Sequence, residues 1–196
     1  MAVMQQRGIS MTIPVWKPAR ADMLKRTAHF KNLKEVNTGV PDMEIDGYRR
    51  SFFSVMDFAK PKDEGQFSPS GSDVVPAIIE STAGYGVAYI KAQPGNGVMM
   101  HNHDTNESFL VMEGTWTVGW EGDAGKDKVV LEKYDFITMP PHVYRDFHCV
   151  TAGEGKDYGL MMAIVIGTAP EGTPAAAEFS PEAKELIAQV ETAKQA

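Results

Sequence analysis

Two histidines and a glutamate stand close together near the middle of the chain, in the stretch HNHDTNE over residues 101–107. On a β-strand, residues i and i+2 lie on the same face, so the imidazoles of His101 and His103 would point into the same space. The intervening DTN favours a turn that would return Glu107 toward this pair. Two neutral imidazoles and one carboxylate form a ligand set that suits a divalent transition metal. We therefore predict a metal site of His101, His103 and Glu107.

The alternative is that these three side chains are solvated groups on a surface loop, since short motifs recur by chance. The surrounding sequence favours strands, however. From residue 50 to residue 167, short runs such as SFLVMEG, TWTVGW and YGLMMAIVIG are rich in β-branched and aromatic residues, and turn clusters such as QPGNG and EGDAGKD separate them. Many short strands at close spacing favour a barrel or a two-sheet roll over alternating strands and helices.

The glycines that flank the cluster complete a longer pattern. Gly95 lies six positions before His101 and Gly114 seven after Glu107, which gives G-x5-H-x-H-x3-E-x6-G. With this pattern the chain resembles the cupin superfamily, whose first signature motif it reproduces, and the resemblance extends over residues 74–167, about half the chain. It implies an all-β fold, a cupin or jelly-roll β-barrel, with an N-terminal arm and a C-terminal helix added here.

A second cupin motif, G-x5-P-x-G-x2-H-x3-N, corresponds here to YDFITMPPHVYRDFHC. Pro140 is in place, but four positions depart from the motif. Tyr134 and His142 replace the two glycines, Arg145 replaces the histidine that is normally the fourth metal ligand, and Cys149 replaces the asparagine. The resemblance therefore implies three protein ligands, with water or substrate in the open positions.

Two nearby histidines are candidates for the missing ligand. His142 would need a bent backbone to reach the metal. His148 should point outward, because strand parity places it on the face opposite to Arg145. We expect both side chains to be structural or exposed.

Arg145 would point into the barrel if it occupies the fourth-ligand position, and an unpaired charge there is costly. Three interpretations follow from this. The guanidinium pairs with Glu107 or another acidic side chain, it holds the carboxylate of a substrate, or the strand is shifted and Arg145 is exposed.

The motif register also predicts a set of apolar and aromatic side chains on the inward face of the barrel. Most of them are expected to be core, while an opening at the metal end would accept a small molecule with an apolar body. The predicted inward residues are Met99, Phe109, Val111, Trp116, Val118 and Phe147. The candidates for substrate contact are Arg145, Phe109, Trp116 and Phe147.

We divide the chain into an N-terminal arm (1–46), the barrel (47–168) and a Pro/Ala-rich connector with a C-terminal helix (169–196). In the arm, a short helix after Pro18 would turn Met23 and Leu24 inward.

The C-terminal helix has clearer signals. Ser180 is a typical N-cap and Pro181 suits the first helical position. Leu186, Ile187 and Val190 form a narrow apolar stripe, which predicts that this helix lies against the barrel or a partner subunit.

Composition limits the classes of partner. Of 196 residues, 19 are Lys or Arg and 26 are Asp or Glu, for a net charge of −7. Without a basic surplus, we expect neither nucleic acid nor an anionic membrane as a partner. The single cysteine excludes an intrachain disulfide. The first 20 residues contain no apolar stretch typical of a secretory signal, so the expected location is cytoplasmic.

The resemblance implies a metal-dependent enzyme acting on a small organic substrate, either carboxylate-bearing or aromatic, with a dioxygenase as the first expectation. Fe(II) is the favoured metal, and Mn, Ni or Zn would suit the same ligands. Isomerases, decarboxylases and lyases share this fold and ligand set. The alternative is a non-catalytic small-molecule-binding cupin with a degenerate metal site. The family also implies a homodimer.

Overall fold

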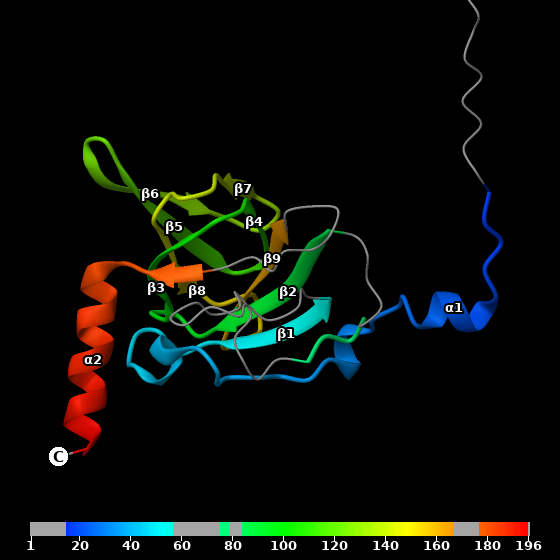
Figure 1. Cartoon of the computed structure of the whole chain (residues 1–196), viewed down its shortest axis with the longest axis horizontal. Helices are drawn as coiled ribbons and strands as arrows, with labels where there is room; N and C mark the ends of the chain where they lie inside the picture. The colour runs from blue at the N-terminus through cyan, green and yellow to red at the C-terminus, as the bar shows by residue number, and fades with distance from the viewer. Residues whose placement is uncertain (1–14, 57–74, 79–83, 167–176, 196) are drawn as a thin grey trace, which may run out of the picture.

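The computed structural model describes residues 15–56, 75–78, 84–166 and 177–195, and in these ranges two five-stranded antiparallel sheets form a β-sandwich (Figure 1). The first sheet has the order β1 (Ser51–Met56), β2 (Tyr85–Ala92), β9 (Gly159–Ile166), β4 (Glu107–Glu113) and β7 (Phe136–Met139). The second has the order β10 (Ala177–Phe179), β3 (Gly97–His103), β8 (Arg145–Thr151), β5 (Thr115–Gly122) and β6 (Gly125–Leu131).

Strands that are distant in the sequence lie side by side in both sheets. Strand β9 runs between β2 and β4, and β8 runs between β3 and β5. This interleaving is the arrangement of a jelly roll, in which the chain crosses repeatedly from one sheet to the other. The predicted all-β jelly-roll fold is confirmed.

The core fills the space between the two sheets. Strand β2 alternates exposed or half-buried with buried residues along most of its length, as expected for a strand with one face on the core. The ring of Phe147 packs edge-on against Phe109 and Trp116, with ring centroids 5.2 and 6.0 Å apart. Each such buried side chain contributes about 1.5–3 kcal/mol to folding. The predicted inward residues are all buried: Met99, Phe109, Val111, Trp116, Val118 and Phe147.

Strand β3 contains a β-bulge immediately before the two histidines. Val98 pairs with Phe147 and His101 pairs with Arg145, so three steps along β3 match two steps along β8. Two residues of β3, Met99 and Met100, therefore stand opposite one residue of β8. The extra residue resets the side-chain alternation, because Val98 and His101 line the same cavity although they are three positions apart and would face opposite sides of a regular strand.

The N-terminal arm contains α1 (Arg20–Leu24) and two short 3-10 turns, η1 (Phe30–Asn32) and η2 (Pro41–Glu44). The predicted short helix exists, but the prediction that its apolar residues turn inward is wrong, since Met23 and Leu24 are 47% and 52% exposed. Helix α1 stands apart from the sheets (Figure 1), so its apolar side chains have no sheet surface to pack against. None of the described helices is long and apolar enough to cross a bilayer.

The C-terminal helix α2 (Pro181–Gln195) begins as the sequence predicts, because the Ser180 hydroxyl accepts a hydrogen bond from the Ala183 N–H at 3.3 Å. Ile187 is buried against the core cluster, whereas Leu186 is 39% exposed. The composition of residues 169–179 predicts a connector, yet the last three form β10, which pairs with β3. Three residues are too short for a period-of-two pattern to be recognised in sequence.

Tyr134 and His142, which replace the two motif glycines, both have left-handed backbones, with φ of 77° and 65°. The turns have therefore kept a conformation that suits glycine although the residues have changed. For a residue with a Cβ atom this conformation costs roughly 1–2 kcal/mol, and less for His than for Tyr.

We predict that Tyr134→Gly raises the free energy of unfolding by about 0.5–1 kcal/mol. Relief of the left-handed strain outweighs the greater flexibility of glycine in the unfolded chain. Tyr134 is 71% exposed, so little packing is lost. The control is Phe136→Gly, which removes another exposed aromatic residue, but from strand β7, and should destabilise. Denaturant unfolding of both variants is the measurement, and a less stable Tyr134→Gly protein would contradict the prediction.

Candidate metal centre

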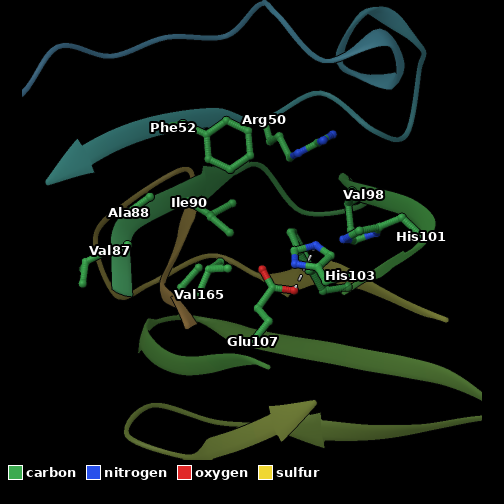
Figure 2. A pocket seen from close by; sticks show the side chains of 13 residues that line it. Arg50, Phe52, Val87, Ala88, Ile90, Val98, His101, His103, Glu107 and Val165 are labelled. Atoms are coloured by element: carbon green, nitrogen blue, oxygen red, sulfur yellow. Dashed lines mark ion pairs between the residues drawn. The ribbon is translucent and has the colours of Figure 1, made fainter. Parts of the chain in front are cut away.

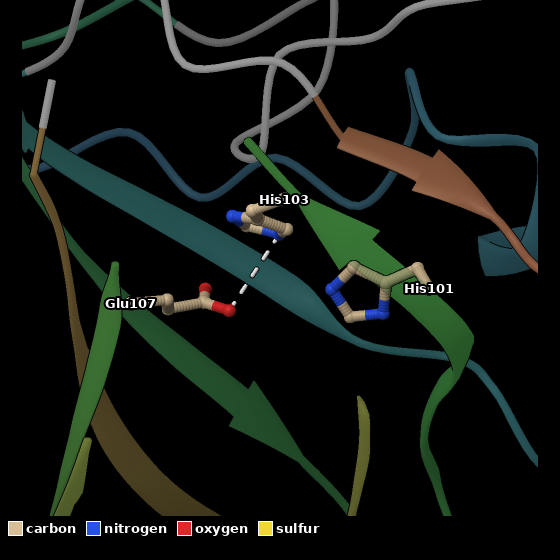
Figure 3. Close-up of side chains that lie close together, drawn as sticks. All are labelled: His101, His103 and Glu107. Carbon is tan, nitrogen blue, oxygen red and sulfur yellow. Dashed lines mark ion pairs between the residues drawn. The ribbon is translucent and has the colours of Figure 1, made fainter. Parts of the chain in front are cut away.

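The three predicted ligands converge inside the barrel from two strands of different sheets (Figure 3). His101 and His103 come from the end of β3, and Glu107 is the first residue of β4. One ligand atom from each side chain lies within 4.8 Å of the other two, and all three residues are at most 4% exposed. The alternative that these side chains are solvated on a loop is therefore wrong.

The hydrogen bonds of the cluster leave ligand atoms without partners. The Nδ1 of His101 lies 2.8 Å from the carbonyl oxygen of Met99. Because a carbonyl only accepts, this contact places the proton on Nδ1 and leaves the lone pair on Nε2. His103 Nε2 lies 3.6 Å from Glu107 Oε2, and neither atom has a hydrogen-bond partner. Buried polar atoms without partners are costly, and a metal ion would satisfy them.

The electrostatics of the site favour neutral imidazoles. Burial, reinforced by the positive charge of Arg145, lowers the pKa of His101 to about 3. Burial likewise holds the pKa of His103 well below its ordinary value, with the neighbouring His101 as the next cause. Metal ligation requires the neutral form of histidine, so both imidazoles are ready to bind at neutral pH.

Glu107 responds in the opposite direction, because burial disfavours its charged form. Burial raises the pKa of Glu107 to about 7, and the nearby Arg145 only partly offsets this. A divalent cation would favour the carboxylate much more strongly than one guanidinium at this distance, so metal binding should release a proton from Glu107 near neutral pH.

Arg145 is fully buried, which excludes the alternative of a shifted strand with an exposed arginine. Its Nη1 lies 3.7 Å from Glu107 Oε2, and its Nη2 donates a hydrogen bond of 3.4 Å to the carbonyl of Pro140. The Nε and Nη1 groups have no hydrogen-bond partner. Glu107 is thus too far from Arg145 for a hydrogen bond, and the Nε and Nη1 groups of Arg145 could still donate to another acceptor.

The two other candidate histidines do not join the cluster. The side chain of His142 is exposed, and its backbone N–H donates to the carbonyl of His103 at 2.7 Å. His148 is half-buried against Tyr48, with ring centroids 5.7 Å apart.

A cavity of about 30 Å³ lies beside the three ligands (Figure 2), enough for a metal ion and a very small group. Of the four residues predicted to contact substrate, Phe147 lines this cavity, whereas Phe109 and Trp116 pack behind it. Arg145 is not among the lining residues and lies behind Glu107, with its Nη1 3.7 Å from Glu107 Oε2. Val98 lines it in place of Met99, because the bulge in β3 changes the alternation. The sequence analysis missed Arg50, which lines the cavity from a position 51 residues before His101.

Solved structures with a similar fold include an oxalate oxidase, which superposes with a TM-score of 0.52 and 18% identity, over 92% of this chain and 76% of that chain. Peruvianin-I, described as a cysteine peptidase from Thevetia peruviana latex, superposes with a TM-score of 0.50 and 17% identity, over 86% of this chain and 88% of that chain. At such identities the likeness shows the fold alone.

Other neighbours are much longer than this chain. The oxalate decarboxylase of Lactobacillus farciminis matches with a TM-score of 0.47 and 14% identity, over 75% of this chain. The chain spans 34% of that decarboxylase and 26% of a vicilin from Capsicum annuum. No model of a protein family matches the chain, and no curated protein sequence matches it.

We predict that Glu107→Gln makes the metal-free protein more stable than the parent at pH 8. The unfolded parent loses the Glu107 proton near pH 4.5, whereas the folded parent keeps it to about pH 7. Parent stability therefore falls as pH rises between these values, and glutamine removes this loss. At 1.36 kcal/mol per pKa unit, the difference of 7 − 4.5 is worth about 3 kcal/mol.

Denaturant unfolding in the presence of a chelator would measure this effect, and the two proteins should be similar at pH 4. The control is Glu113→Gln on the same strand, whose carboxylate pairs with Lys133 and Lys156 near the surface. That variant should gain no stability at pH 8. A Glu107→Gln protein less stable than the parent at pH 8 would show that the carboxylate is not desolvated.

Proposed function

Because the chain has the cupin fold, which its structural neighbours share, we propose that it is a metal-dependent enzyme acting on a small organic substrate. His101, His103 and Glu107 would hold one divalent transition metal. The observation that carries this proposal is the group of three buried ligand atoms within 4.8 Å of one another, two of which have no hydrogen-bond partner.

Two histidines and one carboxylate leave coordination positions open, as in the non-haem Fe(II) oxygenases. A dioxygenase with Fe(II) is therefore the favoured form of the proposal, while Mn, Ni or Zn would suit the same ligands. When bound, the metal would supply Lewis acidity or redox chemistry. The two imidazoles would provide neutral donors and Glu107 a compensating charge. The apolar wall of Phe147, Ala163 and Val165 would limit the access of water.

Arg145 supports a carboxylate-bearing substrate as the finer proposal. Its guanidinium is fully buried, carries a positive charge at all ordinary pH values and has two nitrogen atoms without hydrogen-bond partners. A carboxylate that approaches the metal could accept hydrogen bonds from this side chain. The small size of the cavity favours a substrate of few atoms.

The second candidate is a small-molecule-binding protein without catalysis. The observation that favours it is Arg145 itself, because a cation near Glu107 opposes the binding of a second cation. In that case Arg145 alone would select a small acid, and the histidines would remain neutral polar groups of the pocket.

We predict that protein purified without chelator carries close to one equivalent of a divalent transition metal per chain. His101→Ala or His103→Ala should abolish this binding, because each variant removes one of only three ligands. The matched control is His148→Ala, which removes a half-buried histidine outside the cluster and should leave metal content unchanged. Elemental analysis is the measurement. Less than about a tenth of an equivalent, even after refilling with Fe, Mn, Ni and Zn, would refute the enzyme proposal.

We predict that Arg145→Lys weakens the binding of acetate and oxalate by ~1–3 kcal/mol, because an ammonium cannot reproduce the two parallel hydrogen bonds of a guanidinium. Arg145→His should also weaken carboxylate binding but raise metal affinity, since it restores the fourth ligand of the family motif. Calorimetric titration of both variants tests the proposal. If both bind metal and small acids as the parent does, Arg145 has no role in selection.

A further inference from the structure

The N-terminal arm carries a buried ion pair that reaches the strand of the two histidine ligands. Asp42 lies in the 3-10 turn η2 and Arg50 lies just before β1, and their side chains are 0% and 2% exposed. Arg50 Nη2 donates to Asp42 Oδ1 at 2.9 Å, and Arg50 Nη1 donates to Asp42 Oδ2 at 3.0 Å. Figure 2 shows Arg50 extending from the start of β1 toward the strand of Val98 and His101.

The same two side chains bind the backbone of β3 at its bulge. Asp42 Oδ2 accepts a hydrogen bond of 3.0 Å from the N–H of Met99, and Arg50 Nη1 donates one of 3.1 Å to the carbonyl of Gly97. A bulge interrupts the hydrogen-bond ladder between strands and leaves backbone groups to be satisfied elsewhere. The Asp42–Arg50 pair satisfies one such group, the N–H of Met99, and also the carbonyl of Gly97, two residues earlier on β3.

These contacts continue directly to a metal ligand. The Met99 residue that donates its N–H to Asp42 also accepts, through its carbonyl, the hydrogen bond from His101 Nδ1 at 2.8 Å. The arm therefore holds the residue that orients the imidazole, and it stabilises the bulge that turns His101 and His103 inward. Groups that orient a ligand from outside the coordination sphere typically change metal affinity 10- to 100-fold when they are removed.

We infer that Asp42 and Arg50 are positioning residues of the metal centre, which set the orientation of His101 through the bulge in β3. This inference rests on the proposed function, because it assigns the ion pair a role in metal binding. Neither residue belongs to a cupin motif. Arg50 lines the cavity beside the ligands, and both residues bind the backbone of β3 rather than the ligand side chains. A purely structural pair would stabilise the arm without affecting the geometry of the imidazole.

The test replaces the pair with apolar residues of comparable size, Asp42→Leu together with Arg50→Met. Removing both partners leaves no uncompensated buried charge. The N–H of Met99 and the carbonyl of Gly97 lose their side-chain partners, so we expect a folded protein that is less stable than the parent. The matched control is Asp46→Leu together with Arg49→Met, which makes the same substitutions in an exposed ion pair of the same arm, with its nitrogen and oxygen 2.8 Å apart. Near-ultraviolet circular dichroism establishes that both variants are folded.

The first measurement is titration of each metal-free protein with Co(II), followed by its visible spectrum. We expect the Asp42→Leu/Arg50→Met protein to bind Co(II) at least about tenfold more weakly than the parent, with an altered spectrum, and the control to match the parent. The two substitutions remove one positive and one negative charge together, so the net charge beside the site is unchanged and weaker binding reports the orientation of the ligands. A folded variant with parental affinity and spectrum overturns the inference.

The second measurement is independent of metal. Nitrogen-15 labelling of the five histidines resolves the tautomer of each ring in the metal-free protein. The parent and the control should show His101 protonated on Nδ1, whereas the Asp42→Leu/Arg50→Met protein should show a mixture of tautomers. An unchanged tautomer overturns the inference while leaving the proposed function intact. If the parent itself binds no Co(II), the proposed function fails and the metal role of the pair fails with it.

Discussion

The burial of a few polar side chains inside an apolar barrel determines both the chemistry of the candidate site and its cost to the stability of the fold. His101, His103, Glu107 and Arg145 are withdrawn from water, yet several of their polar atoms have no hydrogen-bond partner. Each buried group without a partner costs about 1–3 kcal/mol, which is a large fraction of the net stability of a domain. The barrel can tolerate such groups because its two sheets bury a continuous hydrophobic core behind them. A ligand that satisfies these groups would stabilise the folded state by the free energy of its binding.

The general fold could be predicted from local sequence because the pattern of each strand depends on its own residues. Strands β4, β5 and β9 coincide closely with short apolar runs, and the start of α2 follows from its N-cap and proline. The bulge in β3 could not be predicted, because Val98 and Met99 are both apolar and fit either alternation. The length of β10 and the exposure of α1 depend on which surfaces the folded sheets offer, and the sequence of those segments does not contain that information.

The residues of the candidate site also fall into those that local sequence predicts and those that only the tertiary fold brings to the site. His101, His103 and Glu107 are neighbours in sequence, and their spacing alone brings them together once the strands form. The inward direction of Arg145 followed from its register in the second motif, and its pairing with His101 across β8 and β3 agrees with that prediction. Asp42 and Arg50 carry no local signal of function, because they meet β3 only through the tertiary fold. Residues that orient a ligand from another segment are generally beyond the reach of motif analysis.

The charges of the site indicate why one pocket would hold both a metal and an anion. Glu107 and Arg145 together are neutral when both are ionised, and Asp42 neutralises Arg50. A divalent cation would add two uncompensated positive charges in a cavity from which water is largely excluded, and Arg145 would oppose it. An anionic ligand placed between the metal and Arg145 would reduce that repulsion. Each would therefore strengthen the binding of the other, and by linkage the coupling must be equal in both directions. Arg145, which weakens the site for a bare metal ion, would thus favour the complex of the metal with a small acid.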